Sequence, residues 1–305
     1  MRSIVGKFRK KSGRYKKFVI WGERSPNIDS FRYIMHHYYD TLRKLNIPAI
    51  WVDDTKENLQ LVESGDLVIA ANVTGRNLRL KKNVYYCLHN FDRELYRDIN
   101  KKFRLVLQVY NRDADKGTEK WDPVTRFDRK DKILYQPWGT NLLPWEFMSP
   151  VAQEKSRFVF WVGSIWDNEQ HQGNLGVIKD LKGSLKKYGI YFVHLRVPDL
   201  LSIKFMRYSR IAPAFGGLWQ AKVNYMPCRV FKNIPYGQLG ITNIPKFKEL
   251  LGDSFLNGNS IEEWVEAAMN LSSFEYKEMV LAQQEKIKSQ TYLHKLLNIM
   301  TALEE

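Results

Sequence analysis

Phe18-Val-Ile-Trp-Gly22 is a short apolar run that ends in glycine, and a helical pattern follows it from Ser30 to Leu45. This order is typical of a strand that leads into a helix. It recurs, with Pro48-Ala-Ile-Trp-Val-Asp53 as a strand, Thr55 to Ser64 as a helix and Asp66-Leu-Val-Ile-Ala-Ala-Asn72 as the next strand. Short apolar runs that alternate with helical stretches predict a parallel sheet with helices on both faces.

Three more apolar runs in the first half predict strands, at Asn83 to His89, Phe103 to Val109 and Lys132 to Gln136. The pattern stops between Pro137 and Lys155, where Pro-Trp-Gly-Thr, Leu-Leu-Pro-Trp and Ser-Pro form a turn-rich stretch. Such a stretch is typical of a linker between domains. We therefore predict about six strands before the linker.

A second series of the same kind follows the linker. Arg157-Phe-Val-Phe-Trp-Val-Gly163 is again an apolar run that ends in glycine. The other predicted elements are a helix at Asn174 to Tyr188, strands at Tyr191 to Arg196, Gln238 to Asn243 and Ser254 to Leu256, and helices at Pro245 to Leu251, Ile261 to Leu271 and Phe274 to Leu303. Both halves thus repeat the strand-helix-strand order of an α/β protein.

The chain has 305 residues, more than one hydrophobic core usually serves, so we expect two domains. We place the first at residues 1–150, with a basic tail at residues 1–17, and the second at residues 151–280. Residues 281–305 are expected to form a C-terminal helix that packs on the body and crosses back to the first domain. Cys87 and Cys228 lie in apolar or aromatic surroundings, which favours buried thiols over a disulfide or a zinc site.

The net charge of +15 and the isoelectric point of about 9.6 predict attraction to polyanions, namely nucleic acid, anionic lipid headgroups or nucleoside diphosphates. Part of the excess lies between Lys7 and Lys17. Such a run usually forms a solvated tail, and the alternative is a handle for membrane surfaces or RNA. Because neither a membrane-spanning run nor a secretory signal is visible, we expect a cytoplasmic protein.

Parallel sheets bind ligands beyond the carboxyl ends of their strands, where loops and helix N-termini offer backbone N–H groups to anions. Gly163-Ser164 follows the first strand of the second half, and its small residues let a backbone approach a diphosphate closely. A purely structural turn is the alternative. Arg210 adds positive charge further along the chain, with a solvated face as its alternative.

The most specific pattern is Arg229-Val-Phe-Lys-Asn-Ile-Pro-Tyr-Gly237 followed by Gly240-Ile-Thr-Asn243. Here the sequence resembles the nucleotide-binding half of GT-B glycosyltransferases, in particular glycosyltransferase family 1/4-like and spore-maturation type enzymes. The resemblance covers residues 157–300 in pattern. It implies an α/β protein of GT-B architecture, with two Rossmann-like domains that face each other across a cleft. The first domain would then bind the acceptor and the second the nucleotide sugar.

We take Gly163, Ser164, Arg210, Arg229, Lys232, Asn233, Tyr236 and Gly237 as the candidate donor-binding residues, and of these Arg229, Lys232, Asn233 and Gly237 take places of the family's motif. The sequence departs from the family at one of them, because Lys232 stands where many relatives have a glutamate that binds the ribose hydroxyls. A lysine cannot accept a hydrogen bond from a hydroxyl. Either Asn233 makes the ribose contact, or Lys232 and Arg229 bind the donor phosphates, which their charge favours. Ordinary salt bridges at an exposed helix start are the structural alternative.

An inverting transferase also needs a base that deprotonates the acceptor hydroxyl. Glu23 and Asp29 follow the first predicted strand and His89 ends the fourth, so these three are the catalytic candidates. Asp29 as a helix cap and His89 as a core histidine are the alternatives. Asp113-Ala-Asp115 has the spacing of a metal-binding motif, but a turn cap explains it better, so we expect no metal.

These expectations describe a metal-independent hexosyl- or deoxyhexosyltransferase that moves a sugar from a GDP- or UDP-sugar to a hydroxyl of a glycan or lipid-linked acceptor. It needs no cofactor besides this donor substrate. Its basic N-terminus is expected to contact an anionic membrane at the cytoplasmic face, and no nucleic acid is expected. One alternative is a basic α/β protein that binds nucleic acid through Trp21, Trp51 or Trp138. The other is a sugar-nucleotide-binding relative without transferase activity.

Overall fold

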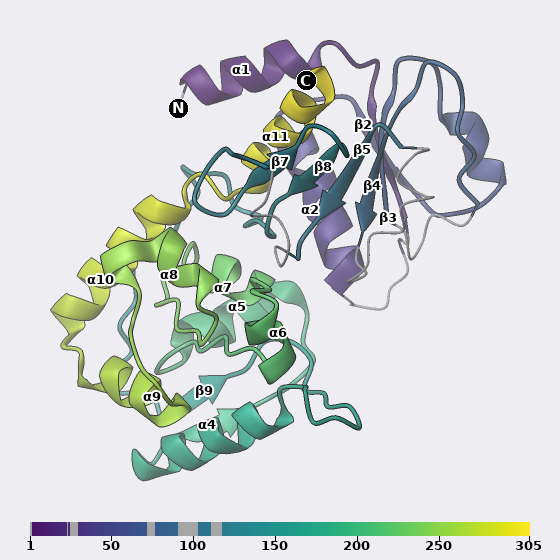
Figure 1. The fold of residues 1–305 in the computed structure, drawn as a ribbon. Coiled ribbons are helices and arrows are strands. Elements are labelled where there is room, and N and C mark those ends of the chain that lie inside the picture. Colours follow the sequence, from purple (N-terminus) through teal and green to yellow (C-terminus); the bar gives the residue numbers. More distant parts are fainter. Residues whose placement is uncertain (1, 23, 25–29, 72–76, 91–102, 111–117) are drawn as a thin grey trace. The chain divides into compact units, whose positions relative to one another are not determined.

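The structure is a computed structural model and describes residues 2–22, 24, 30–71, 77–90, 103–110 and 118–305. The chain divides into two compact units, of which unit 1 comprises Met1–Leu143 with Thr291–Glu305 and unit 2 comprises Pro144–Gln290. Unit 1 is thus built from two separate segments of the chain, whereas unit 2 is continuous (Figure 1).

Unit 1 is built on a mixed sheet whose strand order is β2-β1-β3-β4-β5-β8-β7-β6. The six neighbouring strands β2-β1-β3-β4-β5-β8 are parallel. Strands β7 and β6 continue the sheet in antiparallel fashion. The bounds are β1 (Phe18–Trp21), β2 (Ala49–Val52), β3 (Leu67–Ala71), β4 (Tyr85–Asn90), β5 (Leu105–Gln108), β6 (Glu119–Lys120), β7 (Arg126–Asp128) and β8 (Ile133–Tyr135). The six strands predicted from the sequence are all present. The β6–β7 hairpin was not predicted, because its strands are too short and too polar to give an apolar run.

Two helices of unit 1 pack against each other beside this sheet. They are α2 (Ser30–Lys44) and α11 (Tyr292–Glu304), and the rings of Tyr38 and Tyr292 meet edge to face at 4.9 Å. Apolar side chains recur every three or four residues on both helices, which gives each helix one buried face. The helix predicted at Thr55 to Ser64 is only a short 3-10 helix, η1 (Glu57–Leu61).

The basic N-terminal segment differs from the expectation of a solvated tail. It forms helix α1 (Arg2–Ser12), which packs against α11 (Figure 1). Phe8 is fully buried, and Lys11 and Arg14 both form ion pairs with Glu304. The reason is that Phe8 and Ser12 lie one turn apart and give the helix a face that can be buried, while the cations remain outside.

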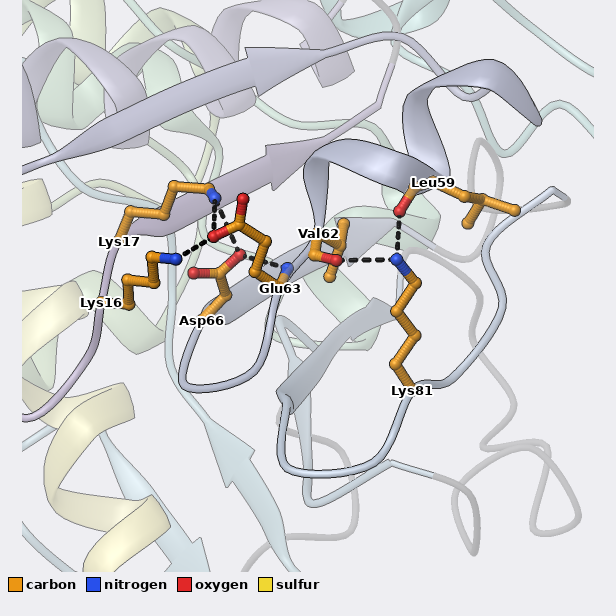
Figure 2. A network of polar contacts seen from close by, with 7 residues as sticks. All are labelled: Lys16, Lys17, Leu59, Val62, Glu63, Asp66 and Lys81. Atoms are coloured by element: carbon orange, nitrogen blue, oxygen red, sulfur yellow. Dashed lines mark hydrogen bonds and ion pairs between the residues drawn. The ribbon is translucent and has the colours of Figure 1, made fainter.

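A polar network fixes the edge of the sheet where β1 and β3 begin (Figure 2). Asp66 is fully buried, accepts a hydrogen bond from the Glu63 amide at 2.7 Å and forms an ion pair with Lys17 at 3.3 Å. Glu63 also pairs with Lys16 and Lys17. Lys81 donates to the carbonyls of Leu59 and Val62, so it caps the end of η1, where helix carbonyls lack partners.

Unit 2 has a smaller sheet than the sequence predicts. Strands β9 (Phe158–Phe160) and β10 (Tyr191–Val193) are parallel, and β9 is flanked on its other side by an extended segment whose Arg210 amide donates to the Phe158 carbonyl at 2.8 Å. The strand predicted at Gln238 to Asn243 is reduced to an isolated parallel bridge between Pro213 and Ile241. Pro213 has no N–H to donate, which limits this ladder.

The core of unit 2 contains Val159 of β9, the following Trp161, and apolar residues of α4, α9 and α10. The bounds of the helices of unit 2 are α4 (Leu175–Lys187), α5 (Asp199–Tyr208), α6 (Leu218–Lys222), α7 (Cys228–Asn233), α8 (Lys246–Leu251), α9 (Ile261–Asn270) and α10 (Ser273–Ile287). The strand predicted at Ser254 to Leu256 is replaced by a 3-10 turn, η2 (Gly252–Ser254). The C-terminal helix predicted at 281–305 is divided between α10 and α11, because Thr291 caps a new helix by accepting from the His294 amide.

Candidate functional site

The carboxyl end of β9 carries a glycine turn that is tied to the start of α4. Gly163 has a φ of +107°, a value that L side chains rarely adopt, and it is exposed together with Ser164. Asn174 donates from its side-chain amide to the Ser164 carbonyl at 3.0 Å and accepts from the Trp166 amide at 2.8 Å. Because Asn174 immediately precedes α4, this side chain holds the turn at the N-terminus of the helix. Asn174 does not cap that N-terminus with its side chain, and no other side chain of the described residues does so, which leaves its first amides available to an anion.

The loop between the turn and α4 is held by its own polar side chains and by close backbone packing. Asp167 accepts from the Gly173 amide at 3.0 Å, and its second oxygen lies 3.0 Å from the His171 ring. The hydrogen bond from His171 is the main cause of a lowered pKa for Asp167. A Cβ on Gly217 would clash with the backbone of Gly173, so a larger side chain at Gly217 would displace this loop.

Arg229 lies beneath the glycine turn. Its guanidinium donates to the carbonyls of Val162 at 3.3 Å and Phe215 at 3.0 Å, and its Cζ stands 4.1 Å from the centre of the Trp161 ring. The residue is only 9% exposed, and burial lowers its pKa to about 10, so the group is still charged at neutral pH. In the part of the chain that the structure describes, no carboxylate pairs with it. A buried cation without a counter-ion is unfavourable unless an anion binds nearby.

Lys232 and Asn233 continue α7 away from Arg229. Lys232 is buried and its Nζ lies 3.2 Å from a carboxylate oxygen of Asp199, the first residue of α5. Asn233 donates to the Ala212 carbonyl at 2.6 Å, whereas its Oδ1 is buried without a hydrogen-bond partner among the described residues. The Lys232–Asp199 pair brings a half-exposed carboxylate to the side of the sheet where β10 ends.

Three of the predicted donor residues lie at the opposite edge of the sheet. Arg210 is beside Phe158, where β9 begins. The Tyr236 carbonyl accepts from Arg207, and a Cβ on Gly237, whose φ is +85°, would clash with the Ser149 carbonyl. The structure therefore groups Gly163, Ser164 and Arg229 at the carboxyl edge and separates Arg210, Tyr236 and Gly237 from them, because α7 runs from one edge to the other.

Of the catalytic candidates, only His89 lies in the described residues; Glu23 and Asp29 lie outside them, as do Asp113 and Asp115. His89 is 1% exposed, faces the Tyr38 hydroxyl at 3.4 Å and stacks on Trp138 with 5.1 Å between ring centres. Burial lowers its pKa to about 3, so the imidazole is neutral at physiological pH. The structure thus places His89 among the aromatic core side chains of unit 1.

Two carboxylates that the sequence reasoning did not single out follow β2. Asp54 accepts from the Trp21 indole at 2.7 Å and from the Asn77 amide at 3.0 Å, and Asp53 accepts from the Arg24 amide at 2.6 Å. Strand order reverses between β1 and β3, and the carboxyl ends at such a reversal are where open α/β sheets bind ligands. Their signal in the sequence is their place directly after an apolar run.

The tryptophans named for nucleic-acid binding are poorly placed for base stacking. Trp21 is fully buried and Trp138 is 3% exposed, while the Trp51 indole donates to the Gly22 carbonyl at 3.0 Å. Within the described residues, no group of three His, Cys, Asp or Glu side chains gathers as a metal site. None of the helices in the same residues is long and apolar enough to cross a membrane.

Comparison with solved structures shows that the α/β fold resembles GT-B trehalose-6-phosphate synthases over nearly the full chain. The E. coli trehalose-6-phosphate structure bound with UDP-2-fluoro glucose covers 95% of this chain and 99% of its own, with a TM-score of 0.58 and 9% identity. An OtsA apo structure covers 99% of this chain and 95% of its own, with a TM-score of 0.52 and 11% identity. No family model and no curated protein matches the sequence. At such low identity the likeness establishes the fold alone.

Proposed function

We propose that this chain is a glycosyltransferase that takes a sugar from a nucleoside-diphosphate sugar, with a UDP-sugar as the first choice, and transfers it to a hydroxyl of a glycan or lipid-linked acceptor. One observation carries the proposal: the buried Arg229 guanidinium, beneath the Gly163-Ser164 turn, has no carboxylate partner among the residues that the structure describes. The GT-B-like fold supports it, and the E. coli protein of that fold is bound with UDP-2-fluoro glucose.

The leaving nucleoside diphosphate has to be neutralised as the bond to the sugar breaks. We propose that its phosphates bind over Gly163 and Ser164, against the uncapped amides that begin α4. Arg229 donates two of its five N–H groups to carbonyls, so its other N–H groups and its positive charge can interact with the phosphates. Charge acts more strongly in a buried setting than in water, so this cation is proposed to replace a metal ion.

Asp199 is our proposal for the ribose contact. Lys232 stands where relatives have glutamate, and it pairs with Asp199, so a carboxylate is still delivered to this edge by another element. A carboxylate can accept hydrogen bonds from both ribose hydroxyls, which a lysine cannot do. For the acceptor base, we retain Glu23 and Asp29 as proposals and add Asp53, an exposed carboxylate at the end of β2.

A nucleotide screen tests the proposed function. We expect UDP, among UDP, GDP, CMP and ADP, to stabilise the protein by about 2.7 kcal/mol at a hundredfold excess over its Kd, measured by thermal shift. Arg229→Gln should weaken UDP binding about tenfold or more. It should weaken UMP binding less, because UMP lacks the second phosphate that the arginine would contact in UDP. Arg157→Gln removes the same charge at the exposed amino end of β9 and should leave the affinity unchanged.

Two results would contradict this assignment. If Arg229→Gln binds UDP as tightly as the original chain while circular dichroism shows it folded, Arg229 is not part of the site. If none of the four nucleotides binds and the protein instead binds oligonucleotides with a steep salt dependence, the alternative of a nucleic-acid-binding protein replaces the transferase.

Asp199→Asn tests the ribose contact separately. The amide keeps the size of the side chain but cannot accept from two hydroxyls in the same way, so we expect about tenfold weaker UDP binding. Pyrophosphate has no ribose and should bind equally well to both proteins in a competition assay. Equal losses for UDP and pyrophosphate would show that Asp199 acts only through the fold or the local charge.

A further inference from the structure

Exposed apolar side chains gather on α5 and on the loop before it. Leu200 is 77% exposed, Tyr208 61% and Leu195 57%, and Leu201 is also exposed. Leu201, Lys204 and Tyr208 follow one another at helical spacings of three and four, and Leu200 precedes Lys204 by four, so these side chains share one face. The opposite face of α5 is buried, through Ser202 and Met206. Apolar side chains grouped in this way mark an interaction surface.

Two exposed cations, Arg196 and Lys204, lie in the same stretch of chain as these apolar side chains. The carboxylate in that stretch is Asp199. That carboxylate is engaged by Lys232. Arg196 and Lys204 are exposed next to the leucines, and neither forms an ion pair in the described part of the chain. The surface therefore offers apolar groups and free cations together, which calls for a partner that is both apolar and anionic.

Charge decides between the two simplest occupants. In a symmetric pair of copies the same patch faces itself, so the interface would gather Arg196 and Lys204 of both copies, and these four like charges oppose association. An anionic lipid bilayer has no such conflict. Its phosphates attract the two cations, and leucines and a tyrosine suit the boundary between headgroups and acyl chains.

The surface is also continuous with the candidate donor site. The loop that follows β10 places His194 Nε2 2.9 Å from the Gly163 carbonyl, and the first residue of α5 pairs with Lys232 at 3.2 Å. The loop before α5 thus connects the face that would contact a bilayer to the Gly163 turn. A sugar acceptor embedded in that bilayer would be presented to the same edge of unit 2.

We propose that the α5 surface, made of Leu195, Arg196, Leu200, Leu201, Lys204 and Tyr208, docks on an anionic lipid bilayer and brings the candidate donor site to an acceptor carried by a lipid. The docking itself is independent of catalysis. Only the statement about the acceptor rests on the proposed function. The proposal also moves membrane contact from the N-terminal helix, where the sequence suggested it, to unit 2.

Vesicle sedimentation of the full chain tests the docking. We expect binding to vesicles of equal parts phosphatidylcholine and phosphatidylglycerol, little binding to pure phosphatidylcholine, and weakening by salt. The double variant Leu200→Glu/Leu201→Glu should bind about tenfold or more weakly, because two charges replace the groups that enter the lipid. Its UDP affinity in solution, measured without vesicles, should be unchanged. This separates a failure of docking from a failure of the proposed donor site.

Two control variants make the result specific to α5. Phe274→Glu changes an equally exposed apolar residue on α10, 74% exposed, and should bind vesicles like the original chain. Lys7→Glu/Lys10→Glu reverses two exposed cations of α1 and should retain most of the binding. The proposal is overturned if the α5 double variant binds vesicles normally, if the α1 variant alone loses binding, or if sedimentation equilibrium shows a dimer that the α5 variant abolishes.

Discussion

Single residues show where this protein keeps charge and titratable groups away from water. The motif singled out Arg229, whose role in donor binding stays a prediction, but its burial beneath a glycine turn depends on tertiary packing and could not be predicted. Asn174 was missed because its role is to bind backbone atoms eight and ten residues away. The sequence could not show that Gly237 packs against Ser149 while Arg229 packs beneath Gly163, because both contacts depend on the tertiary fold.

His89 gives the molecule a pH-dependent stability. Its pKa is lowered to about 3 by burial, so the unfolded chain takes up the proton first as the pH falls below about 6.5. The stability that the neutral imidazole contributes is present above pH 6.5 and is lost as the pH falls towards 3. By pH 5 we expect a loss of about 2 kcal/mol from this group.

Urea unfolding at pH 7 and pH 5 measures this effect. His89→Gln should be less stable than the original chain at pH 7 but should lose about 2 kcal/mol less on going to pH 5. His294, whose pKa is lowered to about 4, contributes a second slope of the same sign that both proteins share. If the two proteins lose the same stability between these pH values, His89 is not buried in the neutral form.

At the scale of elements, the strongest apolar runs gave the correct strands and the weakest did not. Five of the six parallel strands of unit 1 follow from runs that are largely buried, and the sixth, β2, is a half-buried strand at the edge of the sheet. The run at Gln238 to Asn243 has only two large apolar residues, and its neighbour contains Pro213. In the same neighbouring segment the Ser209 hydroxyl accepts from the Phe160 amide in place of a backbone carbonyl. Tertiary hydrogen bonding of this kind leaves no local signal.

Helix α1 provides the test of whether the basic N-terminal segment is part of the fold. Phe8→Ala should lower the free energy of unfolding by about 3 to 4 kcal/mol, because it opens a cavity in a fully buried position. Lys10→Ala, on the exposed side of the same helix, should change it by less than about 0.5 kcal/mol. Urea unfolding followed by circular dichroism compares the two. If the Phe8→Ala and Lys10→Ala variants are equally stable, the N-terminal segment is a solvated tail and not part of the fold.

At the scale of the whole molecule, the two halves have different connectivity. Unit 2 is one continuous stretch, whereas unit 1 needs Thr291–Glu305 to cover α2. The sequence predicted two α/β series and a linker between Pro137 and Lys155, but it could not show which half the last helix would join. An amphipathic pattern specifies that a face is buried and says nothing about its partner.

Removal of residues 291–305 should therefore affect the two units unequally. It exposes the surface of α2 that contacts α11, so we expect unit 1 to unfold or aggregate, whereas unit 2 keeps its structure. Limited proteolysis with mass spectrometry should then yield a resistant fragment close to Pro144–Gln290. Uniform digestion of the shortened chain, or full resistance of both units, would contradict the division.

The return of α11 to unit 1 also has a consequence for synthesis on the ribosome. The residues of unit 1 emerge first, but their sheet remains uncovered on the α11 side until position 304 has left the exit tunnel. Unit 2 is translated in between and can finish folding while the earlier half waits. Unit 1 thus begins to emerge before unit 2 but completes its fold after it. Its exposed strands are the segments that a chaperone would have to shield until then.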